Sequence, residues 1–103
     1  MTHEEAAFLE AGKKNKGAEL SQMFGKPCFK INGKAFISLF ENEMVFKLNG
    51  ETHEEALSIK GSQLFDPSGK KRPMKEWVQV PGIHSSKWEG FAKAAFDYVK
   101  RNS

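Results

Sequence analysis

The segment that decides the fold reads Phe29-Lys30-Ile31-Asn32-Gly33-Lys34-Ala35-Phe36-Ile37-Ser38-Leu39-Phe40. Asn-Gly between two apolar runs is a strong signal of a β-hairpin, because a type I′ turn needs two residues that tolerate positive φ. A two-residue loop pairs Ile31 with Lys34 and Phe29 with Phe36. We therefore expect Phe29 and Phe36 to share one face of a sheet, with Ile37 on the other.

Further strands follow this hairpin along the chain. A turn at residues 41–43 precedes an apolar run at 44–48, which extends the hairpin into a three-stranded meander. Residues 63–65 form a short extended piece, and 76–80 form a further strand that Pro81-Gly82 ends. Between them, residues 66–69 have the composition of a turn, and 70–73 that of an exposed basic loop.

Helices are expected at both ends of the chain. Thr2 and Glu5 have the spacing of a capping box, so a helix begins there and Gly12 interrupts it. A second helical stretch is predicted at residues 17–23, either as a separate short helix or as the continuation of one kinked helix. Ser86, with Glu89 three residues later, is the predicted N-cap of the last helix. That helix carries an apolar stripe at helical spacing, formed by Trp88, Phe91, Ala92, Ala95 and Val99.

The pentapeptide Thr-His-Glu-Glu-Ala occurs twice, at residues 2–6 and 52–56. Its flanking residues do not match, so we interpret the two copies as two helix starts with capping boxes rather than as a domain repeat. The order of elements is then helix, meander, short helix, strand, helix. This order predicts a two-layer α+β domain, with a mainly antiparallel sheet packed against the N- and C-terminal helices.

Length and composition limit the classes of protein that remain. The chain has 103 residues, which suits one domain over residues 1–103. Its apolar runs are far shorter than the ~20 residues of a membrane helix, and its acidic N-terminus lacks the apolar core of a signal peptide. The single cysteine, Cys28, excludes an internal disulfide and a cysteine zinc site. We expect a cytoplasmic protein without a membrane contact, a metal or a cofactor.

The net charge of +3 is unevenly distributed. Residues 12–34 hold six lysines against Glu19 alone, and residues 60–75 hold five cations against Asp66, whereas residues 41–55 hold five glutamates against Lys47. Basic clusters can bind a phosphate backbone or an acidic protein. The simpler interpretation is a lysine-rich surface that contacts only solvent. Arginine, the usual reader of base edges, occurs only twice. The predicted binding residues are Lys26, Lys30, Lys34, Lys70, Lys71 and Arg72.

The sequence contains no strong catalytic pattern. The three histidines, His3, His53 and His84, are far apart and do not form a zincin motif. Cys28 is interpreted as a small buried residue; the alternative is a reactive thiol, favoured by nearby Lys26 and Lys30.

The aromatic residues also allow two interpretations. Trp77 and Trp88 are expected in the core rather than at a ligand site. The alternative interpretation is a sheet surface on which nucleic-acid bases stack, formed by Phe24, Phe29, Phe36, Phe40 and Phe46.

Two motifs resemble the N-terminal domain of the TfoX/Sxy competence regulators. The first is Met23-Phe24-Gly25, followed by a strand, an Asn-Gly turn and Phe36; the second is Pro73-Met74-Lys75-Glu76-Trp77-Val78-Gln79-Val80-Pro81. The Lys26-Pro27 pair followed by Phe29 is also similar to the MmcQ/YjbR proteins. The resemblance covers residues 20–102 and consists mostly of turn and core residues.

This resemblance implies a small non-enzymatic binding or regulatory domain, linked to transcription or competence regulation. It brings no catalytic residues to carry over. Complete competence regulators have a second, helical domain at the C-terminus, which we do not expect in these 103 residues. The partner is an unidentified protein or nucleic acid, and a homodimer is a further alternative. A small enzyme or thiol-reactive protein that uses Cys28 is the competing functional hypothesis.

Overall fold

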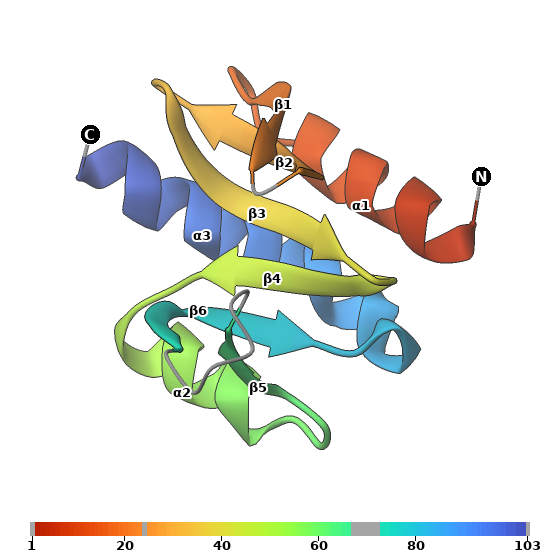
Figure 1. The fold of residues 1–103 in the computed structure, drawn as a ribbon. Coiled ribbons are helices and arrows are strands. Elements are labelled where there is room, and N and C mark those ends of the chain that lie inside the picture. Colours follow the sequence, from red (N-terminus) through yellow and green to blue (C-terminus); the bar gives the residue numbers. More distant parts are fainter. Residues whose placement is uncertain (1, 24, 67–72, 103) are drawn as a thin grey trace.

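The structure is a computed structural model that describes residues 2–23, 25–66 and 73–102. Within these residues it contains, in chain order, α1 (His3–Lys13), β1 (Glu19–Met23), β2 (Lys26–Ile31), β3 (Lys34–Phe40), β4 (Glu43–Lys47), α2 (Gly50–Ser58), β5 (Gln63–Phe65), β6 (Met74–Val80), the 3₁₀ helix η1 (Gly82–Lys87) and α3 (Trp88–Arg101). The strands form one sheet in the order β1-β2-β3-β4-β6-β5, with every neighbouring pair antiparallel. The predicted α+β class is confirmed (Figure 1).

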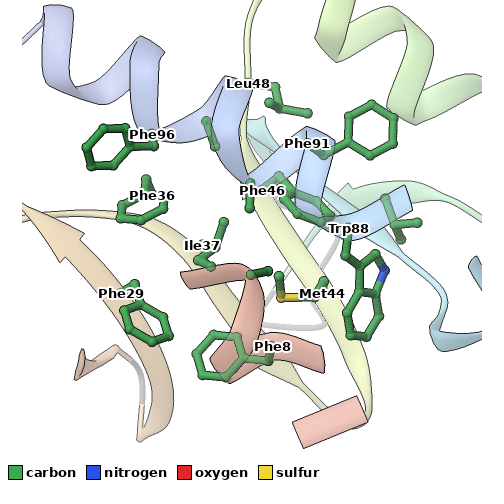
Figure 2. Packing of buried hydrophobic residues seen from close by; sticks show 14 of the residues in the cluster. Phe8, Phe29, Phe36, Ile37, Met44, Phe46, Leu48, Trp88, Phe91 and Phe96 are labelled. Atoms are coloured by element: carbon green, nitrogen blue, oxygen red, sulfur yellow. The ribbon is translucent and has the colours of Figure 1, made fainter. Parts of the chain in front are cut away.

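The three α-helices pack on one face of the sheet, which we call the helix face. In Figure 1, α3 runs behind the central strands. Its predicted apolar stripe is buried, together with Phe96. Figure 2 shows how its rings meet the sheet: Phe96 lies edge-on to Phe36 at 5.3 Å between ring centres, and Phe91 lies 5.6 Å from Phe46. Such tilted ring pairs add to the free energy gained from burying the rings themselves.

Two adjacent rows of residues cross all six strands. The row on the helix face consists of Leu20, Phe29, Ile37, Phe46, Val78 and Leu64. The neighbouring row consists of Ser21, Cys28, Ser38, Val45, Gln79 and Gln63. Because successive side chains of a strand point to opposite faces, this second row belongs to the opposite side of the sheet, which we call the second face.

The decisive hairpin forms with a register different from the predicted one. Ile31 pairs with Lys34 as expected, and Asn32 and Gly33 both have positive φ. However, Phe29 pairs with Ile37 rather than with Phe36, because the register shifts between Phe29 and Lys30. This β-bulge leaves Phe36 as an extra residue, so that it and Ile37 both join the helix-face core. The expected separation of these two residues onto opposite faces is therefore wrong.

The N-terminal helix is longer than predicted. The capping box is confirmed, since Thr2 Oγ1 accepts from the Glu5 amide and the Glu5 side chain accepts from the Thr2 amide, both at 3.0 Å. Gly12 does not interrupt α1, which continues to Lys13. Instead, Gly12 lies directly against Phe29, where a Cβ atom would be 2.1 Å from the ring. The glycine thus allows the helix to approach the sheet closely.

The helical stretch predicted at residues 17–23 is wrong. After Gly17, which has a φ of +94°, residues Glu19–Met23 form the edge strand β1 along β2. A helix of so few residues is unstable in isolation, whereas pairing with β2 satisfies the backbone of both segments.

Two further predicted helix starts are also wrong. Thr52 does not cap α2, which begins at Gly50 with Asn49 as its N-cap; the Thr52 hydroxyl donates back to the Asn49 carbonyl oxygen at 3.0 Å. Ser86 does not cap α3 either, because it lies within η1, and α3 begins only at Trp88. The predicted strands at 63–65 and 76–80 are confirmed as β5 and part of β6.

Candidate functional site

The predicted basic residues do not all gather in one place. Lys26 and Lys30 have the same parity in β2 as Cys28, so they project from the second face, and both are half-buried. Lys34 begins β3 opposite Ile31 of the helix-face core, and its amine donates to the Asn102 carbonyl oxygen at 3.3 Å. Three other members of the predicted set, Lys70, Lys71 and Arg72, lie outside the described residues.

Aromatic rings extend the second face beside Lys26. The Lys26 amine lies 5.5 Å from the centre of the Phe40 ring, within the range of a cation–π contact. Phe40 in turn contacts Phe65 edge-on at 5.3 Å. Phe65, Val45 and Trp77 form a second, smaller buried cluster on this face. The cation is therefore supported by a packed apolar base rather than by a flexible loop.

The centre of the second face holds polar side chains that are buried and paired. Ser38, 2% exposed, donates its hydroxyl to the Pro27 carbonyl oxygen at 2.8 Å. Gln79 donates its amide to Glu43 Oε1 at 2.5 Å. Buried polar groups cost free energy when left unpaired, so these bonds are what allow a polar row at this position.

Cys28 is fully buried between the two serines of its row, as the sequence predicts. Burial raises the pKa of its thiol, and the nearby charge of Lys30 only partly opposes this effect. A nucleophilic cysteine needs the opposite, an accessible thiol with a lowered pKa. The site therefore gives Cys28 the properties of a core residue.

Each histidine uses its Nε2 atom in a contact within the fold. His3 lies 3.2 Å from Ser85 Oγ, His53 lies 2.8 Å from the Lys75 carbonyl oxygen, and His84 lies 3.0 Å from the Lys60 carbonyl oxygen. In the part of the chain that the structure describes, no three His, Cys, Asp or Glu side chains come together as a metal-binding group.

Most of the aromatic residues considered for base stacking lie in the core instead. Phe29, Phe36 and Phe46 are at most 2% exposed and contact the helices, which contradicts a stacking role for these three. Phe40 is half-buried on the second face, and Phe24 lies outside the described residues. Both tryptophans are buried, as predicted.

One cation escaped the sequence prediction. Lys47, half-buried at the end of β4, lines a hollow of about 60 Å³ together with Lys34, Tyr98, Val99 and Asn102. In the sequence, Lys47 lies in the acidic stretch at 41–55, where five glutamates outnumber it. One signal could have located it: the last residue of an antiparallel strand lies near the first residue of the strand before it, here Lys34.

Comparison with known proteins gives no relative: no family model, no curated protein and no solved structure matches the chain. Among the helices that the structure describes, none has the length and apolar character needed to cross a bilayer.

Proposed function

We propose that the chain is a small non-enzymatic binding or regulatory domain, resembling the TfoX N-terminal domain and linked to transcription or competence regulation. The observation that carries the proposal is that the helices cover one sheet face, while lysines project from the other. The helices take up one face, while β2 presents Lys26 and Lys30 from the other. Half-buried cations at the margin of a strand face are suited to contacts with an acidic partner.

The partner is an acidic macromolecule, either a nucleic acid or an acidic protein. The scarcity of arginine argues for contacts to phosphates or carboxylates rather than to base edges. The lone, buried cysteine suits the reducing environment of the cytoplasm, where we propose that the domain acts.

A salt-dependent titration tests this proposal. Wild-type protein is added to a fluorescent DNA duplex and, separately, to fluorescent polyglutamate, each at salt concentrations from 20 to 300 mM. We expect binding to at least one of them that weakens with salt and weakens further in the Lys26→Gln/Lys30→Gln variant. The matched control is Lys60→Gln/Lys87→Gln, which removes the same charge from two exposed lysines elsewhere. The absence of affinity for both polyanions at low salt would reject the proposal.

The competing hypothesis of a thiol enzyme has less support, because Cys28 is 0% exposed and its pKa is raised by burial. A Cys28→Ser variant separates the two: a thiol enzyme loses all activity in a substrate screen, whereas a binding domain keeps its affinity.

Self-association also remains a proposal. The edge strand β1 leaves one side without a neighbouring strand in the described sheet, and its residue Leu20 is 57% exposed. Such an edge can pair with a second copy across a twofold axis. Sedimentation of wild-type protein and of Leu20→Lys, a charged substitution that discourages edge pairing, decides this point.

A further inference from the structure

Cations that are distant in the sequence meet at one end of the molecule, which we call the basic end. Lys34 begins β3, Lys47 ends β4, and both line the same small hollow beside Asn102. Lys100 and Arg101 lie in the last turn of α3, next to Asn102. Figure 1 shows this arrangement: the β2–β3 hairpin tip, the end of β4 and the C-terminus of α3 lie on the same side of the fold.

Asp97 of α3 pairs with Lys93 at 3.3 Å, and Glu76 accepts a hydrogen bond from the neutral Tyr98 hydroxyl. Lys34, by contrast, donates to a neutral carbonyl oxygen, which holds its amine in place without cancelling its charge. The C-terminus of a helix carries about half a negative charge, so Lys34, Lys47 and Arg101 together outweigh this partial charge and that of the Glu76 side chain.

The surroundings of these cations favour a phosphate backbone over a protein surface. Protein interfaces bury apolar side chains at their centre. The large exposed apolar residues among those described, Leu20, Leu57 and Ile83, belong to β1, α2 and η1 rather than to the basic end. The rings at this end, Phe36 and Phe96, are buried against each other and offer no surface for stacking unpaired bases.

We propose that the basic end, formed by Lys34, Lys47, Lys100 and Arg101, binds the phosphate backbone of duplex nucleic acid without sequence preference. This inference rests on the proposed function and names the partner and the place of contact. The four contacts of the basic end contribute about −3.6 to the slope of log affinity against log salt, in addition to the contribution of Lys26 and Lys30. This contribution alone lowers the affinity about 150-fold between 50 and 200 mM salt.

The test measures fluorescence anisotropy of two 20-base-pair duplexes of unrelated sequence across that salt range. For Lys34→Gln/Lys47→Gln we expect the slope to become shallower by about 1.8, which corresponds to two lost phosphate contacts. The control Lys60→Gln/Lys87→Gln removes equal charge near the N-terminal end of α3. That end lies about 20 Å from the basic end along the 14-residue helix, so the control keeps the wild-type slope.

A further variant guards against a folding artefact. Lys34→Gln removes the bond to the Asn102 carbonyl, so its loss of affinity could reflect a frayed helix end. Arg101→Gln leaves that bond in place, and we expect its slope to become shallower by about 0.9.

Each outcome decides between the two proposals. Equal slopes for the basic-end variant and the control overturn this inference. If only Lys26→Gln/Lys30→Gln loses affinity, the proposed function stands and the basic end is rejected. Binding to polyglutamate that is as tight as binding to the duplexes identifies an acidic protein and also rejects it. If neither polyanion binds, the proposed function fails as well.

Discussion

The two faces of the sheet are built from adjacent residues of the same strands, yet they are organised by different physical rules. In β4, Phe46 points toward α3 and meets Phe91, while its neighbour Val45 joins the small cluster on the second face. The helix-face row is apolar across all six strands, whereas the second row mixes serine, cysteine and glutamine with Val45.

The two faces are stabilised in different ways, and under the proposed function they also have different roles. The helix face gains its free energy from burying large rings, at roughly 25 cal/mol per Å² of apolar surface. The second face keeps its polar residues paired through bonds such as that from Ser38 to Pro27, and places Lys26 and Lys30 at its margins. Substitutions on the first face should therefore change stability, and substitutions at the margins of the second should change binding.

The largest effect is expected from Phe46→Ala. Removing this buried ring leaves a cavity beneath α3 and should lower the free energy of unfolding by about 3–5 kcal/mol. Val45→Ala, on the same strand but the second face, should cost about 1–2 kcal/mol, because only two methyl groups are lost. Urea unfolding measures both. Equal losses would mean that the two faces contribute alike.

Gly12→Ala should have the next largest effect. The added methyl group meets the Phe29 ring, so α1 must move away from the helix face, at about 1–3 kcal/mol. Gly90 in α3 is the matched control, because a Cβ there has open space around it. Gly90→Ala should raise stability by about 0.5–1 kcal/mol through helix propensity. A stabilising Gly12→Ala would show that the close approach is not required.

The stability of the protein should depend on pH through the buried thiol of the second face. Burial raises the pKa of Cys28, so the folded protein holds this proton at pH values where the unfolded chain releases it. The protonated thiol contributes fully to folding stability below the ordinary thiol pKa of about 8.5. This contribution is lost as the pH rises through the higher pKa of the folded protein. We expect stability to decrease above pH 8.5 by at most about 1.4 kcal/mol per pH unit, and this slope to be smaller in Cys28→Ala. An identical slope in both proteins would show that the Cys28 thiol does not cause this pH dependence.

The smallest effect on stability is expected from Lys26→Gln. The amine contacts Phe40 at the surface, and its loss should change the free energy of unfolding by less than about 0.5 kcal/mol. Binding of a polyanion should nevertheless weaken. Thermal unfolding and anisotropy on the same samples separate the two effects; a large loss of stability would make Lys26 a structural residue.

The fold was predictable from the sequence wherever the signal was local and strong. The Asn32-Gly33 turn, the apolar stripe of α3 and the capping box at Thr2 all depend on residues a few positions apart. The bulge at Phe36 and the strand β1 were not predictable in this way, because both depend on pairing with β2. A one-residue change of register moves side chains to the other face, and local sequence does not reveal it.

The repeated pentapeptide shows the same limit. Thr2 accepts from a helix amide, while Thr52 sits inside a helix and donates to the Asn49 carbonyl. The difference comes from what precedes each copy, since Asn49-Gly50 already begins α2. The candidate site was likewise only partly predictable: Lys26 and Lys30 share a strand, but the meeting of Lys34 with Lys47 requires the folded sheet.

Lysine footprinting tests directly whether the lysines of the second face and of the basic end make the contact with a polyanion. The protein is acetylated at low salt with and without excess duplex, and modification of each lysine is quantified by mass spectrometry. We predict protection of Lys26, Lys30, Lys34, Lys47 and Lys100, with unchanged modification of Lys60 and Lys87. Protection of Lys60 and Lys87, with Lys26, Lys30, Lys34, Lys47 and Lys100 left reactive, would contradict the account.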